Sequence, residues 1–202
     1  MTRPILLVLT ATAVLCGSFA PSAAQELDND ASTLLLLHCN NNLTGASGET
    51  PTTQSGVTFE NAVHGKGARF AANNQVWFDP AGNIDGTQGT LELWIKPAWA
   101  SDDGLSHDIL RWGDAGGMVI GKDGAAYLHV DVNRYTPQWL GTGVVLHGEW
   151  PAGQWHHCAF TWGPGELEVY VDGRVRARLV PAYPPPSVSA MLQIGGIDIH
   201  NG

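Results

Sequence analysis

Helical periodicity is almost absent from this sequence of 202 residues. No long stretch places apolar side chains at the i, i+3, i+4 and i+7 positions of an amphipathic helix. Instead, short β-rich runs alternate with clusters of Gly, Pro, Asn and Asp, and most of the 25 glycines and 12 prolines lie between the runs. This alternation predicts an all-β fold of many short strands and turns, a sandwich or jelly roll.

Basic residues are also few. The chain has 10 Lys and Arg against 19 Asp and Glu, a formal net charge of -9. Nucleic acids and anionic membranes both require a basic face, so this balance argues against either as a partner. Beyond the first residues, no apolar run is long enough to insert into a membrane.

The first residues are typical of an export signal. Arg3 precedes an apolar run over residues 5–15, and small residues follow at Ser22-Ala23-Ala24. This pattern predicts a signal peptide at residues 1–24, cleaved near Ala24. A lipoprotein signal ending at Cys16 is disfavoured, because the preceding Leu15 is bulky. We therefore expect the protein to be secreted, periplasmic or at the cell surface.

The remaining residues, 25–202, show no internal repeat and have a length typical of one domain. The chain stops at His200-Asn201-Gly202 without a closing turn. This ending predicts a domain that is truncated at its C-terminus.

Cysteine is scarce, and only Cys39 and Cys158 remain after the signal peptide. Each lies in an apolar run that predicts a buried strand, and the strand predicted next to Cys39 is Thr33–His38. The two either close a disulfide around a long loop or serve as small apolar residues. No CxxC pair is present, which excludes a zinc ribbon or thioredoxin-like site.

One hairpin can be predicted in register. The runs Glu166–Val171 and Val175–Val180 flank Asp172-Gly173. A three-residue loop with Gly173 in the left-handed conformation would pair Val169 with Val175 and Leu167 with Ala177, leaving one face apolar. The other face would then pair Glu168 with Arg176 and Glu166 with Arg178.

Catalytic motifs are missing. A glucanase needs two carboxylates across the scissile bond, and the nearest acidic run, Glu166-Leu167-Glu168, faces arginines in the predicted hairpin. No G-x-S-x-G motif is present. The neighbours His156 and His157 point to opposite faces of a strand and therefore cannot share a metal ion. The sequence thus predicts a protein that is not an enzyme.

Six segments carry a family resemblance. They are LLLLHCNNN (Leu34–Asn42), GKGARF (Gly65–Phe70), GTLELWIKP (Gly89–Pro97), GQWHHCAFTW (Gly153–Trp162), LEVYVDGRV (Leu167–Val175) and LQIGG (Leu192–Gly196). In order and spacing they resemble the laminin G-like domains of bacterial secreted proteins, within the concanavalin A-like lectin/glucanase family. The resemblance implies a jelly-roll sandwich of two antiparallel sheets. It also implies a module that is mostly non-catalytic in this family, some members binding glycans or a calcium ion.

The sequence departs from the family at both ends. Cys39 and Asn40 stand where the family's first strand ends in an aromatic and an acidic residue, and only Asp198 remains of the acidic closing strand. Calcium is the cofactor that the resemblance allows. Its candidate ligands here are Asn40, Asn42 and Asp198, without an EF-hand-type loop to support them.

The candidate ligand site lies in the second half of the chain. His129 and Asp131 share a strand face at i and i+2. The segment after them combines hydrogen-bonding groups with rings that can stack on a sugar. The candidate ligand-binding residues are His129, Asp131, Asn133, Arg134, Tyr135, Trp139 and, at a strand end, Trp112.

These observations predict a secreted, non-catalytic binding or adhesion module, with a glycan or another extracellular polymer as its partner. The alternatives are a glucanase-type glycoside hydrolase and a purely structural module or fragment of a larger surface protein. A pair of carboxylates without partners on one sheet face would favour the hydrolase.

Overall fold

The structure, a computed structural model, describes residues 27–71, 73–113, 117–132, 140–180 and 191–196. The predicted signal peptide at residues 1–24 lies outside this range. Within the described residues the regular elements are all β-strands, so the prediction of an all-β fold is confirmed. No helix there is long and apolar enough to span a membrane.

The strands are short, as the spacing of the turns predicts. They are β1 (Thr53–Ser55), β2 (Thr58–Asn61), β3 (Lys66–Arg69), β4 (Gln75–Phe78), β5 (Gly89–Ile95), β6 (His107–Trp112), β7 (Met118–Lys122), β8 (Tyr127–Val132), β9 (Leu140–Val145), β10 (His156–Gly163), β11 (Glu166–Val171), β12 (Arg174–Leu179) and β13 (Leu192–Gly195).

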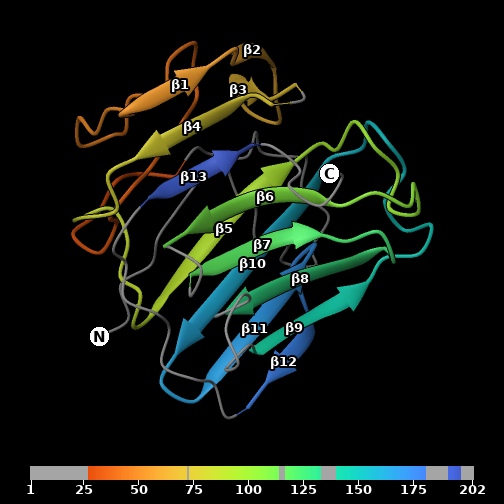
Figure 1. Cartoon of the computed structure of the whole chain (residues 1–202). Coiled ribbons are helices and arrows are strands. Elements are labelled where there is room, and N and C mark those ends of the chain that lie inside the picture. Colours follow the sequence, from red (N-terminus) through yellow and green to blue (C-terminus); the bar gives the residue numbers. More distant parts are fainter. Residues whose placement is uncertain (1–26, 72, 114–116, 133–139, 181–190, 197–202) are drawn as a thin grey trace, which may run out of the picture.

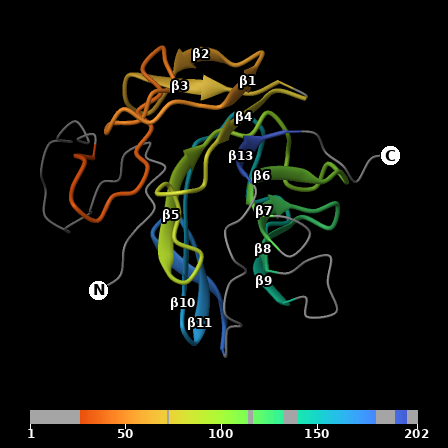
Figure 2. The ribbon, with the colours of Figure 1, turned by 60° about the vertical axis from the view of Figure 1, so that its left-hand side comes forward.

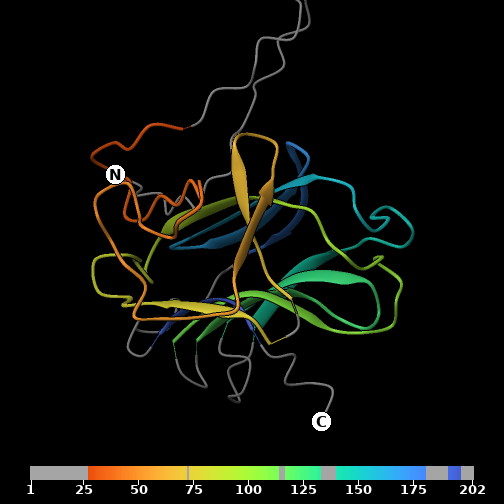
Figure 3. The same ribbon diagram turned by 90° about the horizontal axis from the view of Figure 1, so that it is seen from above.

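Two antiparallel sheets form the sandwich (Figures 1 and 2). One has seven strands in the order β1-β4-β13-β6-β7-β8-β9, and the other has four in the order β12-β11-β10-β5. The hairpin of β2 and β3 crosses over one end of the two sheets (Figure 3). Phe59 of β2 and Ala68 of β3 pack against the core, so the hairpin covers that end.

Alternation decides which side chains enter the core. In β5, Leu91 and Leu93 are buried between the sheets, while Glu92 and Trp94 are half-exposed on the other side. Phe160 of β10 and the paired rings of Trp112 and Trp162, 5.1 Å apart, fill the centre.

The predicted strand at Thr33–His38 is wrong, because this segment belongs to no strand of either sheet. Its apolar residues are nevertheless buried. Leu35 and Leu37 pack in the main core, whereas Leu36 packs against Leu27. Because the segment is buried on both sides, its sequence is as hydrophobic as that of a buried strand, although it pairs with no strand of a sheet.

The predicted hairpin register is also wrong. The turn has two residues, Asp172 and Gly173, both with positive φ (50° and 75°), and Val171 pairs with Arg174. A bulge then leaves Arg176 without a paired residue on β11. Because of this bulge, Val169 pairs with the apolar Ala177 instead of the predicted Val175. The bulge turns Arg176 toward Glu149, 2.9 Å away, instead of toward Glu168.

The two cysteines are free thiols, both buried. Burial raises the pKa of the Cys39 thiol to about 11 and raises that of Cys158 further. Both therefore act as small apolar residues, one of the two possibilities that the sequence left open.

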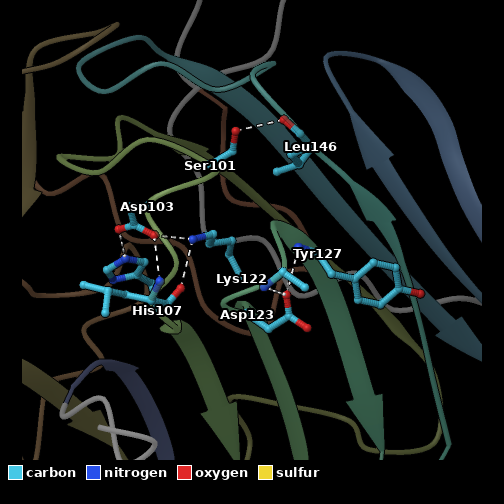
Figure 4. Close-up of polar contacts among 9 residues, drawn as sticks. Ser101, Asp103, His107, Lys122, Asp123, Tyr127 and Leu146 are labelled. Carbon is cyan, nitrogen blue, oxygen red and sulfur yellow. Dashed lines mark hydrogen bonds and ion pairs between the residues drawn. The ribbon is translucent and has the colours of Figure 1, made fainter.

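Lys122 holds one end of the sandwich together (Figure 4). Its side chain is fully buried, yet its ammonium group donates to the carboxylate of Asp103 and, at 2.9 Å, to the carbonyl of Leu105. The same ammonium lies 5.6 Å from the centre of the Trp99 ring. Lys122 thereby ties the loop between β5 and β6 to the β7 strand.

The carboxylate of Asp103, which contacts Lys122 and His107, makes the stability of this end of the sandwich depend on pH. Burial opposes its ionisation, but hydrogen bonds from Lys122 and His107 outweigh that effect and lower the pKa to about 2. A carboxyl with a lowered pKa stabilises the fold above its unfolded pKa of about 4, and this contribution is lost as the pH falls towards about 2. The stability advantage of the wild type over Asp103→Asn is therefore expected to shrink between about pH 5 and pH 2.

Urea unfolding at a series of pH values measures this difference. Asp102→Asn, at an exposed neighbouring residue, is the control and is expected to follow the wild type. Parallel pH profiles for Asp103→Asn and the wild type would contradict the assignment.

Candidate functional site

The outer side of the seven-stranded sheet carries a continuous row of residues that crosses every strand. Core residues such as Val76 and Leu192 alternate with this row, so the row faces away from the second sheet. Paired in register from β1 to β9, its members are Thr53, Trp77, Gln193, Arg111, Val119, Asp131 and Gly141. A second row beside it contains Asp108, Gly121, His129 and Gly143. We call the two rows together the polar face.

Charged side chains on the polar face occur in pairs. Arg111 Nη2 lies 3.4 Å from Asp108 Oδ2, and His129 Nδ1 lies 3.1 Å from Asp131 Oδ2. Asp108, His129 and Asp131 are each less than a tenth exposed. The face is thus a largely buried cluster of polar groups and not a solvated surface.

Three nitrogen atoms on this face are buried without a hydrogen-bond partner. They are Trp77 Nε1, Arg111 Nε and His129 Nδ1, the last being close to Asp131 but not in hydrogen-bonding geometry. Buried polar atoms are nearly always paired, and exceptions point to water, ions or ligands. These three lie on β4, β6 and β8, every second strand, and the strands that carry successive groups are about 10 Å apart.

Glycines lie on both sides of His129. Gly121 of β7 and Gly143 of β9 are its cross-strand neighbours, and Gly141 is the neighbour of Asp131. A Cβ at Gly143 would lie 2.1 Å from the Leu128 carbonyl oxygen, and one at Gly141 would lie 2.3 Å from the Asp131 carboxylate. A side chain at Gly143 would therefore force the backbones of β8 and β9 apart, whereas one at Gly141 would displace the Asp131 carboxylate.

Tyr127 continues this side of β8. Its ring stacks on that of His129, with centroids 6.3 Å apart. Burial raises the pKa of the Tyr127 phenol, and the nearby charges of Asp131 and Asp123 raise it further. The phenol therefore keeps its proton and remains able to donate a hydrogen bond.

The structure places part of the predicted ligand site on the polar face. His129 and Asp131 share this face of β8, as expected. Four candidates, Asn133, Arg134, Tyr135 and Trp139, lie outside the described residues.

The expectation of an exposed ring at Trp112 is wrong. This ring is 1% exposed and packs on Trp162, so it offers no surface to a sugar. Its neighbour Arg111, which points the other way, reaches the polar face instead.

Sequence reasoning missed three members of this face: Trp77, Asp108 and Arg111. The strand of Trp77 alternates between Val76 and Phe78 on the core side and Gln75 and Trp77 on the other. That alternation was a usable signal. The nearness of Asp108 to Arg111 was not, because it depends on a bulge between Asp108 and Leu110.

The predicted calcium ligands do not converge in the described part of the chain. The side-chain oxygen of Asn40 accepts from the Lys66 amide at 2.8 Å, and that of Asn42 accepts from the Thr44 amide at 2.9 Å. Asp198 lies outside the described residues. Within those residues, no group of three His, Cys, Asp or Glu side chains is arranged to hold a metal ion.

The two adjacent histidines point in opposite directions. His156 faces inward, stacks on Trp150 at 4.5 Å and contacts Asp172, while His157 faces outward and lies 2.8 Å from Glu92. They therefore do not meet at one metal ion, as alternation along a strand requires.

The family follows from comparison with known proteins. Residues 70–201 match the model of a family described as the concanavalin A-like lectin/glucanases superfamily. The chain belongs to this superfamily, which confirms the resemblance seen in the motifs. No curated protein matches the sequence.

Solved structures share the fold at low identity. Domain 4 of AbnA, an extracellular arabinanase of Geobacillus stearothermophilus solved with arabinotriose, has a TM-score of 0.61 at 20% identity, over 78% of this chain and 80% of that one. A botulinum neurotoxin type C structure, titled for its interaction with two ganglioside molecules, has a TM-score of 0.59 at 16% identity, over 82% of this chain. The chain spans only 43% of that toxin chain.

Proposed function

We propose that this chain is a secreted, non-catalytic carbohydrate-binding module whose ligand lies on the polar face. The observation that carries the proposal is that Trp77 Nε1 on β4, Arg111 Nε on β6 and His129 Nδ1 on β8 are buried without a hydrogen bond, His129 Nδ1 having only the Asp131 carboxylate nearby. Sugar hydroxyl oxygens accept hydrogen bonds from such donors, and the nearby carboxylates accept from sugar hydroxyl groups. A linear glycan lying across the strands would meet one such group at roughly every second strand, about 10 Å apart.

The neighbours in structure support the class of ligand. The arabinanase domain was solved in complex with arabinotriose, and the work on the type C toxin, of which this chain spans 43%, concerns gangliosides. The polar chemistry of this chain's own face extends that use to the present protein.

The hydrolase alternative is less well supported. A glycosidase requires two carboxyl groups free to act as acid and as base or nucleophile. On the polar face, Asp108 contacts Arg111 and Asp131 contacts His129. Glu166 and Glu168, the nearest acidic run in the sequence, both contact Arg178 on the other sheet.

Trp77→Phe tests the proposal, because it removes the indole N–H and keeps most of the ring. Loss of one hydrogen bond to the ligand is expected to weaken binding about fivefold to tenfold, equivalent to about 1 kcal/mol. Since Nε1 has no partner in the protein, the midpoint of thermal unfolding should not fall. Titration calorimetry with sugars found by a glycan array measures the affinity.

Trp94→Phe is the matched control. Trp94 also has a buried Nε1 without a partner, but it lies on β5 of the other sheet. Its substitution should leave the affinity unchanged. Equal losses in both variants, or none in Trp77→Phe, would exclude the polar face. A folded protein that binds no glycan would favour the purely structural module.

A further inference from the structure

The polar face has one strongly basic side chain among its described residues, and that side chain already has a counter-charge. Apart from Arg111, the only Lys or Arg on the seven strands is Lys122, whose ammonium is turned inward to Asp103. Arg111 lies beside the Asp108 carboxylate. The described face therefore offers a ligand no uncompensated Lys or Arg charge.

The acidic groups of the face point to the same conclusion. Asp108 and Asp131 lie on β6 and β8, on either side of β7, and both side chains are nearly buried. A carboxylate or sulfate group on a sugar would lose its hydration there, and the Arg111 charge that could compensate it is already paired with Asp108. Burying a charge without an opposite partner is costly, so an anionic sugar is disfavoured at this face.

Uncharged hydroxyl groups suit the same atoms. A hydroxyl group both donates and accepts, so one sugar unit can donate to an Asp carboxylate and accept from Trp77 Nε1 or Arg111 Nε. Hydrogen bonds to charged groups are stronger than neutral ones, and they require no net charge on the ligand.

We propose that the ligand of the polar face is an uncharged glycan, and that this face discriminates against sialylated, uronic and sulfated sugars. This inference rests on the proposed function and adds the chemical class of the sugar. The structural neighbours leave the class open, since arabinotriose is neutral whereas gangliosides carry sialic acid. The side chains of this chain decide it.

The test compares neutral and anionic oligosaccharides of similar length. Arabinotriose and cellotriose represent the first class, and sialyllactose and trigalacturonate the second, each titrated at low and high salt. We expect the neutral sugars to bind with affinities that change less than about twofold with salt, since no net charge is screened. The anionic sugars should bind at least about 100-fold more weakly, equivalent to about 2.7 kcal/mol.

Asp108→Asn supplies the sharper comparison. It removes the partner of Arg111, so binding of trigalacturonate should rise about tenfold and become salt-dependent. Asp102→Asn, at an exposed residue of the loop between β5 and β6, should change neither sugar class.

The two proposals fail differently. Tight, salt-sensitive binding of an anionic sugar by the wild type would overturn the inference and leave the carbohydrate-binding function intact. Binding of neither class by a folded protein would overturn both.

Discussion

Replacing Lys122 by Met is expected to lower the free energy of unfolding by about 3 kcal/mol. The substitution keeps the volume of the side chain but removes the ammonium group that Asp103 and the Leu105 carbonyl share. Breaking a buried ion pair leaves one charge without its partner, which typically costs about 3–5 kcal/mol. The lower end applies because the side chain of Asp103 is 21% exposed and also contacts His107 at 2.7 Å.

The effect should extend beyond the pair. The neighbouring Ser101 is fully buried and donates to the Leu146 carbonyl at 2.8 Å, joining the same loop to the segment after β9 (Figure 4). Loss of Lys122 should therefore also make the loop between β5 and β6 more sensitive to limited proteolysis. Urea unfolding and mass spectrometry of the cleavage products measure the two effects.

Lys96→Met is the matched control. Lys96 also contacts a carboxylate, Glu60 at 2.9 Å, and a tryptophan ring, Trp155 at 5.2 Å, but its side chain is 29% exposed. Exposed ion pairs contribute less than about 1 kcal/mol, so this variant should be close to wild type. Equal losses in the two variants would show that burial of Lys122 does not matter.

The second large effect is expected at Gly143. In Gly143→Ala the new Cβ would lie 2.1 Å from the Leu128 carbonyl oxygen and 2.8 Å from the Cα of His129, both backbone atoms that cannot rotate away. Strand β9 must shift from β8, and overpacking of this kind typically costs about 1–3 kcal/mol. Chemical denaturation measures the loss.

Gly163→Ala supplies the control within a strand. A Cβ there meets only the Cβ of Gln88, at 3.9 Å, so no loss of stability is expected. Alanine in place of glycine reduces the entropy of the unfolded chain and should give a gain of about 0.5 kcal/mol. A Gly143→Ala variant as stable as Gly163→Ala would contradict the packing of β8 and β9.

Much of the fold could be predicted from local sequence. The alternation in Thr90–Lys96 identified the two faces of β5, because a strand turns successive side chains to opposite sides whatever its partners are. The run at Glu166–Val171 gave the bounds of β11 for the same reason.

The failures have a common cause. At Thr33–His38, three leucines are buried against different neighbours, and composition cannot distinguish that from a strand. In the β11–β12 hairpin, Val169 faces an apolar residue both in the predicted register, where it pairs with Val175, and in the observed one, where it pairs with Ala177. The choice depended on Asp172 also adopting a positive φ and on a bulge at Arg176, which only the packed sheet decides.

The candidate site divides in the same way. The sequence by itself determined that His129 and Asp131 share a face, because that follows from their spacing within one strand. Only the tertiary structure decided that Trp77, Arg111 and His129 cross the sheet on alternate strands and that Trp112 belongs to the core. The physical reason is that strand periodicity is local, whereas the order β4-β13-β6-β7-β8 joins segments that are far apart in the chain.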